Sequence, residues 1–227
     1  MASPTTAGKA FTAFYHGWLL NQEPIFHQLE SSSSSVSAAV NDEHCSALVA
    51  AVMDHYQEYY TEKKKAAEED VFVFFSSPWL SSFEQSFLWL SGLKPSTLFS
   101  AVDGGMLSEE QSCKMEMLRT ETVKVEGVIC NAMASVQETV AAAPVVGLLK
   151  TEAAGTVING GNCSAALESL KLSVGRVMGS ADDVLASTAL KILEILEPKQ
   201  AVKFLTAVMK FQREVRRWGL YKDSQRV

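Results

Sequence analysis

The sequence has few cysteines and no apolar leader. Its four cysteines, Cys45, Cys113, Cys130 and Cys163, are far apart in a chain of 227 residues and form no CxxC pair. This pattern is typical of reduced thiols in an intracellular protein rather than of a disulfide framework. The opening residues MASPTTAGKA lack the apolar segment of a secretory signal. We therefore expect a protein of the nucleus, the cytoplasm or both.

Long apolar runs and an excess of basic residues are also missing. The most apolar stretch, VAAAPVVGLL at 140–149, has half of the ~20 residues that a membrane-spanning helix needs, and it contains a proline. The net charge is −6 and the isoelectric point is about 5.3, whereas a phosphate-binding surface needs a basic face. These features argue against a membrane span and against nucleic acid as a standing partner.

Helical spacing of apolar residues dominates the chain, and there is no hairpin signal or sustained alternation. Capping-box spacing at Ser82 to Gln85 and Ser108 to Gln111 marks two helix starts, and Pro24 predicts a kink or short break. We predict helices over 11–29, 42–70, 79–90, 108–142, 163–178, 181–196 and 198–218. The predicted fold is all-α, a single domain of about seven helices.

Two segments are expected to connect helices rather than to pack. Residues 31–40 begin with SSSSSVS, and residues 144–162 include Pro144 and the Gly-rich GTVINGGN. We predict a helical domain over 11–220, with these two flexible connectors inside it. Residues 1–10 are predicted to be a flexible N-terminus, and 221–227 a C-terminal tail.

No catalytic constellation or metal site stands out among the polar residues. The four histidines form two pairs eleven residues apart, His16 with His27 and His44 with His55. On a helix this spacing is roughly 16 Å, which no single metal ion spans. GTVINGG lacks the lysine and the strand–turn–helix context of a phosphate-binding loop. We therefore predict a protein that is not an enzyme and has no metal site.

Aromatic residues are concentrated between Val71 and Leu90. Such a stripe usually forms core, and we expect Trp79, Phe83 and Phe87 to be buried. The supply exceeds what one short helix can use, so a ligand cavity between helices is the alternative. Its candidate lining residues are Trp18, His55, Tyr56, Trp79, Phe83, Phe87 and Trp89.

Two basic clusters are candidates for contact with partner proteins. One is the run Lys63, Lys64 and Lys65, and the other comprises Arg213, Arg216 and Arg217 near the end of the chain. Both are expected to be exposed. The ordinary alternative is a solvated helix face with no partner.

Several motifs follow one another in a fixed order. FTAFYHGWLLNQ (11–22) contains W-L-x-x-Q, and residues 55–96 contain HY, KKKAAEEDVF, FLWL and GLKPS. Residues 187–219 contain I-L-x-x-x-Q-A at 195–201. In this order the motifs resemble the plant Delay-of-Germination domain, which also forms the C-terminal part of the TGA class of bZIP transcription factors. The resemblance covers nearly the whole chain.

The resemblance implies a stand-alone plant regulator. No basic region and no leucine heptad precede the domain, and a TGA factor needs both to hold DNA, so direct sequence-specific DNA binding is not expected. Stand-alone relatives act in seed dormancy and abscisic-acid signalling through type 2C protein phosphatases, and one marks pollen apertures at the plasma membrane. Protein partners of the phosphatase class are therefore expected by resemblance. A homodimer is a separate expectation.

The family also suggests two ligands. A fatty acid can lie in the helical interior of TGA domains, and this requires only apolar surroundings. Haem binding in the dormancy regulator uses histidines toward its C-terminal end, whereas the last histidine here is His55, so haem does not carry over by those positions. Three functions are left open. One is a protein-binding regulatory module with an apolar cavity, and the alternatives are a small-molecule sensor and a membrane polarity factor.

Overall fold

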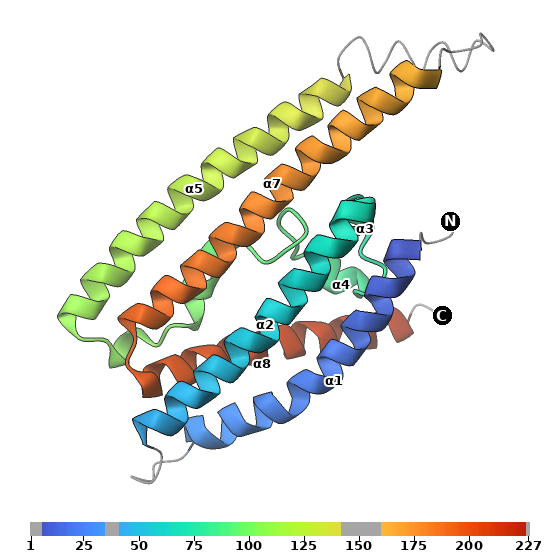
Figure 1. Ribbon diagram of the computed structural model, residues 1–227. Coiled ribbons are helices and arrows are strands. Elements are labelled where there is room, and N and C mark those ends of the chain that lie inside the picture. Colours follow the sequence, from blue (N-terminus) through green and yellow to red (C-terminus); the bar gives the residue numbers. More distant parts are fainter. Residues whose placement is uncertain (1–5, 35–40, 142–159, 226–227) are drawn as a thin grey trace.

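The computed structural model describes residues 6–34, 41–141 and 160–225, and within these ranges the regular elements are helices (Figure 1). They are α1 (Thr6–Ser34), α2 (Asp42–Asp70), α3 (Val73–Ser76), α4 (Ser82–Gln85), the 3₁₀ helices η1 (Pro95–Ala101) and η2 (Gly104–Met106), α5 (Glu109–Ala141), α7 (Gly160–Ile195) and α8 (Pro198–Ser224). The prediction of a single all-α bundle is confirmed. None of the described helices combines enough length and apolarity to cross a membrane.

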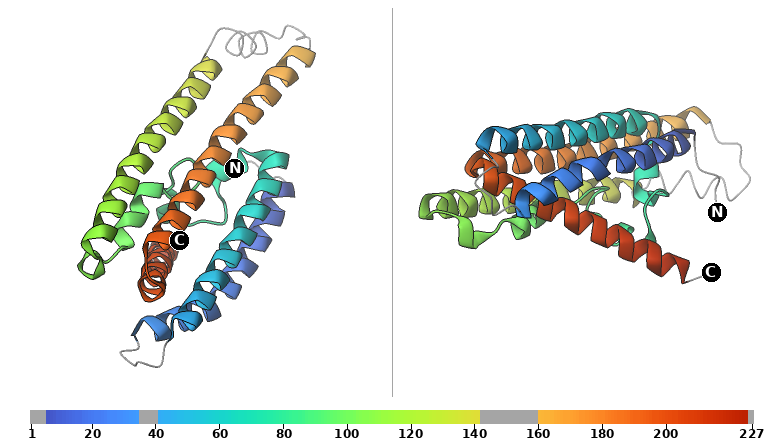
Figure 2. Two further views of the ribbon diagram at one scale, coloured as in Figure 1. Left: turned by 60° about the vertical axis from the view of Figure 1, so that its left-hand side comes forward. Right: turned by 90° about the horizontal axis from the view of Figure 1, so that it is seen from below.

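Two antiparallel helix pairs and one crossing helix form the bundle. Helices α1 and α2 pack against each other, as do α5 and α7, and the two pairs lie side by side in Figure 1. Helix α8 crosses beneath them and contacts α1, α2 and α4. Figure 2 shows that the C-terminal end of α8 diverges from the layer formed by α1 and α2, and the short helix α4 packs against α8.

Local signals in the sequence explain where the helices begin. Asn41 caps α2, because its side chain accepts a hydrogen bond from the backbone N–H of His44. Ser108 and Gln111 exchange the two hydrogen bonds of a capping box at the start of α5, as their spacing predicts. Pro198 occupies the first turn of α8, where a missing N–H costs nothing.

Two helices run further than predicted. Helix α1 continues through Pro24 and on to Ser34. Of the predicted kink or short break, the break is therefore wrong, and so is the start of the connector at residue 31. Helix α7 is one helix where two were predicted, because the buried residues Met178 and Ala181 continue its apolar stripe past Gly179. The predicted connector over 144–162 lies outside the described residues up to 159, and α7 already begins at Gly160.

The ends of the predicted domain also differ from the helices. Helix α1 begins at Thr6, inside the predicted flexible N-terminus, and α8 extends to Ser224, inside the predicted tail. The short helix predicted over 79–90 is a single turn, and its capping box joins Ser81 to Glu84 rather than Ser82 to Gln85. The turn is short because the chain enters a tight loop after it, with Leu90 and Ser91 at positive φ.

The buried apolar residues form two clusters. One joins α1, α2, α5, α7, α8 and η1, and its least exposed members are Leu29, Cys45, Val52, Ile192, Val202 and Met209. The other is aromatic and centres on Phe11, whose ring lies 4.9 Å from Phe74 and 4.7 Å from Trp79. Tyr56 packs against both clusters.

The predicted burial of the aromatic stripe is correct only in part. Trp79 is buried. Phe83 is half-buried, and Phe87 is 46% exposed. The reason is that α4 lies on the outside of α8, so the rings of Phe83 and Phe87 lie beside Trp218 and Phe211 of that helix rather than inside the bundle.

Candidate functional site

A pocket of about 420 Å³ lies among α1, α2, α7, α8 and the loop that carries α4. Its size is within the range of small-molecule sites. Its apolar and aromatic lining residues are Tyr15, Trp18, Leu19, Met53, Tyr56, Tyr59, Tyr60, Trp79, Leu80, Phe87, Leu88, Leu93, Leu98, Leu185, Ala186, Ala189, Leu190, Phe204, Leu205, Val208, Phe211 and Val215. The walls therefore come from segments that are far apart in the sequence.

Four of the seven predicted ligand residues line this pocket, namely Trp18, Tyr56, Trp79 and Phe87. His55 lies behind Trp18, with the two rings stacked at 4.4 Å and 8°. Phe83 and Trp89 are not part of the lining. The ring of Phe83 lies beside those of Phe87 and Trp218, and Trp89 donates a hydrogen bond from Nε1 to Sγ of Cys130 on α5.

Trp18 and His55 tie α1 to α2 at the side of the pocket. Trp18 Nε1 donates a hydrogen bond of 2.9 Å to the backbone carbonyl of His55. The imidazole is buried, and its Nε2 atom has no hydrogen-bond partner. Burial lowers the pKa of His55, and the opposing effect of Glu58 is smaller. His55 is therefore a neutral, stacked ring rather than a charged group.

Four tyrosines, Tyr15, Tyr56, Tyr59 and Tyr60, line the pocket. Burial raises the pKa of Tyr15 to about 12 and raises the pKa of Tyr56, Tyr59 and Tyr60 further above the usual tyrosine value. These phenols are therefore uncharged at physiological pH. Tyr56 donates a hydrogen bond of 2.6 Å to Oε1 of Gln212, which joins α2 to α8.

Lys63 is a buried structural residue, not an exposed contact residue as predicted. Its side chain is 1% exposed, and Nζ lies 2.7 Å from Oδ1 of Asp182 on α7 and donates to the backbone carbonyl of Ser91 at 3.2 Å. Burial lowers the pKa of the Lys63 ammonium and raises the pKa of the Asp182 carboxyl, and the ion pair opposes both shifts. The pair connects α2, α7 and the loop at Ser91. Lys64 and Lys65 are exposed, as predicted.

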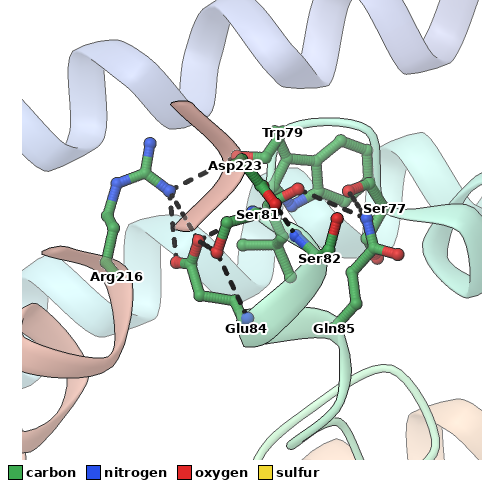
Figure 3. Close-up of polar contacts among 9 residues, drawn as sticks. Ser77, Trp79, Ser81, Ser82, Glu84, Gln85, Arg216 and Asp223 are labelled. Carbon is green, nitrogen blue, oxygen red and sulfur yellow. Dashed lines mark hydrogen bonds and ion pairs between the residues drawn. The ribbon is translucent and has the colours of Figure 1, made fainter. Parts of the chain in front are cut away.

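Two residues of the arginine cluster, Arg213 and Arg216, form ion pairs within the bundle. Arg216 Nη1 lies 3.2 Å from Oε1 of Glu84 and 3.4 Å from the backbone carbonyl of Trp79 (Figure 3). Arg213 Nη1 lies 2.6 Å from Oε1 of Glu23 on α1. Both guanidinium groups are mostly shielded from solvent, so the prediction that these two arginines are exposed is wrong. Arg217 is exposed as predicted, and it pairs with Glu214 one turn earlier.

The loop that closes one side of the pocket is held by its own polar contacts (Figure 3). Ser81 and Glu84 form a capping box, and Gln85 Nε2 donates to the backbone carbonyls of Ser77 and Leu80. The backbone N–H of Ser82 donates to Oδ2 of Asp223 at the end of α8. These contacts fix α4 against α8.

Several polar residues of the lining were missed at the sequence level, and Gln22 is the one with an amide donor left without a partner. Gln22 on α1 is 3% exposed, lines the pocket, and its Nε2 atom has no hydrogen-bond partner. A buried amide donor without a partner is unfavourable unless something else accepts its hydrogen bond. Its position in the W-L-x-x-Q motif was the available signal. Among the residues that the structure describes, no group of three His, Cys, Asp or Glu side chains is placed to hold a metal ion.

Known proteins resemble this chain in sequence. The family model described as "DOG1: Seed dormancy control" matches residues 26–103. Three Arabidopsis thaliana proteins are similar over most of the chain. "Protein DOG1-like 4" is 34% identical over 92% of this chain and 91% of its own length, and "Protein RESPONSE TO ABA AND SALT 1" is 31% identical over 90% and 92%. "Transcription factor TGA5" is 28% identical over 93% of this chain and 65% of its own length. The chain therefore belongs to the DOG1 family, the Delay-of-Germination domain proteins.

Proposed function

We propose that this protein is a non-enzymatic regulator of the seed-dormancy and abscisic-acid class, which acts by binding partner proteins and holds an uncharged apolar molecule in its pocket. The family description and the name of the relative that responds to abscisic acid and salt support the biological class. Type 2C protein phosphatases are the partner class implied by the family, and the nucleus and cytoplasm are the compartments we expect. The pocket is the observation on which the ligand part of the proposal depends.

The polar groups of the pocket favour binding over catalysis. The three cations of its lining are each next to a carboxylate, Lys63 by Asp182, Arg213 by Glu23 and Arg216 by Glu84. The tyrosines of the lining are protonated, and His55 lies behind Trp18. A general base or an activated nucleophile needs a pKa near the working pH and a reacting partner within hydrogen-bond reach, which this arrangement does not favour.

The same pairing indicates the chemistry of the ligand. A fatty acid would bring a carboxylate into a pocket whose cations are already neutralised, and burying an unpaired charge is costly. An uncharged molecule avoids this cost, and a carbonyl or hydroxyl oxygen on it could accept the hydrogen bond that Gln22 Nε2 offers. Haem is not favoured either, because the ring of His55 is stacked on Trp18 and is not part of the pocket wall.

Mass spectrometry of purified and then denatured protein tests whether a small molecule co-purifies. In parallel, calorimetric titration compares 2-dodecanone with dodecanoate, which have an uncharged and a charged head on matched chains. We expect the ketone to bind more tightly. Gln22→Leu should weaken ketone binding by about two- to tenfold, the equivalent of one neutral hydrogen bond, and Gln28→Leu on the exposed face of α1 is the matched control.

A second pair of variants tests the location of the ligand. Ala189 lines the pocket, and Ala132 is exposed on α5. Ala189→Phe should fill the pocket and abolish binding, whereas Ala132→Phe adds the same ring outside it and should not. No co-purifying molecule and no binding of either probe would refute the ligand part, and tighter binding of dodecanoate would refute the uncharged class. Calorimetry with a purified type 2C protein phosphatase tests the partner class separately, and no measurable binding would refute it.

A further inference from the structure

Four aromatic rings form a continuous strip on the outside of α8 and α4. We call this set, Phe83, Phe87, Phe211 and Trp218, the aromatic strip. The ring centroids are 6.5 Å apart between Phe211 and Phe87, 4.9 Å between Phe87 and Phe83, and 6.2 Å between Phe83 and Trp218. Phe87, Phe211 and Trp218 are 46%, 48% and 50% exposed. Exposed apolar side chains that touch one another mark interaction sites more often than scattered ones do.

The strip continues a helix-packing seam of α8. Phe204, Val208, Phe211, Val215 and Trp218 are spaced alternately by four and three residues, which is the spacing of a seam that packs against another helix. The first two are buried in the core against other helices of this chain. Beyond Phe211, α8 still contacts α1 through Arg213, which pairs with Glu23, and Arg216, which lies over the ring of Tyr15. The C-terminal end of α8 then diverges from the layer of α1 and α2 (Figure 2). Val215 and one side of Phe211 face the pocket, and about half of the surface of Phe211 and of Trp218 remains exposed for a helix of another molecule.

The strip is fixed in place before any partner arrives. Gly219 packs so closely against α4 that a Cβ atom there would lie 1.9 Å from Oγ of Ser81. Arg216 binds Glu84 from the same side, and the N–H of Ser82 is held by Asp223 (Figure 3). These contacts hold α4, which carries Phe83, against α8, which carries Phe211 and Trp218. A preformed surface loses little conformational freedom when it binds.

The charge around the strip is opposite to that of the rest of the chain. Helix α8 contains seven Lys or Arg and two Asp or Glu, a net charge of +5, so the other residues of the chain, with its total of −6, carry −11 together. Three of the seven, Arg213, Arg216 and Arg217, are paired with Glu23, Glu84 and Glu214, so Lys210 and Lys222 carry most of the positive charge beside the strip. Lys210 and Arg217 are exposed on the turns that carry Phe211 and Trp218. Lys222 Nζ lies 5.0 Å from the ring centre of Trp218. This surface complements a negatively charged partner.

We propose that the aromatic strip is a docking site for an acidic amphipathic helix of another protein. The apolar row of that helix packs on Phe87, Phe211 and Trp218, and its carboxylates face Lys210 and Arg217. Phe211 and Trp218 are seven residues apart, about 10 Å along α8, so two to three turns of the partner suffice. An anionic membrane fits less well, because the net charge of −11 on the rest of the chain would be repelled by it. The proposal rests on the protein-binding role proposed above and names the surface and the kind of partner.

The probe is a synthetic peptide of about 18 residues, five helical turns, with leucine and phenylalanine along one face and glutamate on both flanks. A second peptide replaces every glutamate with lysine. Fluorescence anisotropy with the full chain should show binding of the glutamate peptide and at least tenfold weaker binding of the lysine peptide. Phe211→Ala with Trp218→Ala should weaken binding of the glutamate peptide at least tenfold, as the loss of central aromatic anchors does.

Charge-reversal variants distinguish specific docking from nonspecific hydrophobic binding. Lys210→Glu with Arg217→Glu should reverse the preference, so that the lysine peptide binds more tightly than the glutamate peptide. Met117→Ala with Val128→Ala removes apolar side chains that are exposed on α5 and is the matched control; it should leave binding unchanged. Thermal melts by circular dichroism confirm that each variant is folded.

Three results would overturn the proposal. They are equal binding of the two peptides, unchanged binding by the Phe211 and Trp218 variant, and binding to phosphatidylserine vesicles in place of the peptide. Sedimentation as a dimer that these two substitutions dissociate would assign the strip to a second copy instead. None of these results tests the ligand proposal, because the binding of 2-dodecanone is measured separately on the unsubstituted chain, in which Phe211 still lines the pocket. Failure of the docking surface and failure of the proposed ligand are therefore distinguishable.

Discussion

Replacement of Lys63 tests the central buried contact of the molecule. The Lys63 side chain is 1% exposed and that of Asp182 17%, with Nζ and Oδ1 2.7 Å apart. Lys63→Met keeps the volume and removes the charge, which leaves Asp182 buried without its cation. Breaking a buried pair in this way costs about 3–5 kcal/mol. For a chain of this length that lowers the melting temperature by roughly 6–20 °C.

Urea and thermal denaturation followed by circular dichroism measure this loss, and Lys64→Met is the control. Lys64 is exposed, so its replacement should change the free energy of unfolding by less than about 0.5 kcal/mol. Lys63→Met combined with Asp182→Leu should recover most of the loss, because apolar pairs of similar volume replace buried ion pairs well. Equal melting temperatures for Lys63→Met and Lys64→Met would refute the burial of this ion pair.

The pH dependence of the same variant has a definite sign. Burial raises the pKa of the Asp182 carboxyl, and Lys63 opposes that shift. Without Lys63, the folded state binds a proton at Asp182 more readily than the unfolded state does. The defect of Lys63→Met relative to the wild type should therefore shrink as the pH falls from 7 toward 4. A defect that is constant over this range would show that Asp182 is solvated in the variant.

Two further predictions concern close packing and a buried ring. Gly219→Ala should destabilise the protein by about 1–3 kcal/mol, because its Cβ would collide with Ser81, whereas Gly127→Ala on open α5 surface should stabilise it by about 0.5–1 kcal/mol; equal effects in urea denaturation would contradict the docking of α4 on α8. Burial lowers the pKa of His55 below its usual 6.5, so the unfolded state binds more protons below that pH and stability should fall as the pH falls from about 6.5 to 5. His55→Phe should remove part of this slope in urea denaturation at several pH values, and an unchanged slope would mean that the imidazole is solvated.

Helical content and helix starts could be predicted from the sequence because their causes are local. The spacing of Phe11, Tyr15 and Trp18 defines a buried face within one helix. Capping at Ser108 and the proline at 198 act within a single turn. Helix ends were less predictable. Glycine at 179 weakens a helix locally, yet packing of Met178 and Ala181 on both sides keeps α7 continuous.

The candidate pocket could be predicted only in part. The aromatic residues near Trp79 and the W-L-x-x-Q motif indicate an aromatic, apolar interior, and Trp18, Tyr56 and Trp79 do line it. Which of these aromatic rings face the pocket depends on where α4 packs in the folded protein. Because α4 packs outside α8, Phe87 is at the rim and Phe83 lies outside the pocket, and no periodicity within residues 79–90 contains that information.

The sequence by itself determined the helices and the family, because periodicity, caps and ordered motifs lie within short stretches of chain. Only the tertiary structure decided which charges are free. Lys63 and Asp182 are 119 positions apart, and Arg216 and Glu84 are 132 apart. A lysine run and an arginine cluster look alike whether they are solvated or paired. Their environment is set by the partner helix that folding brings against them, and ion pairing over such separations has no local signature.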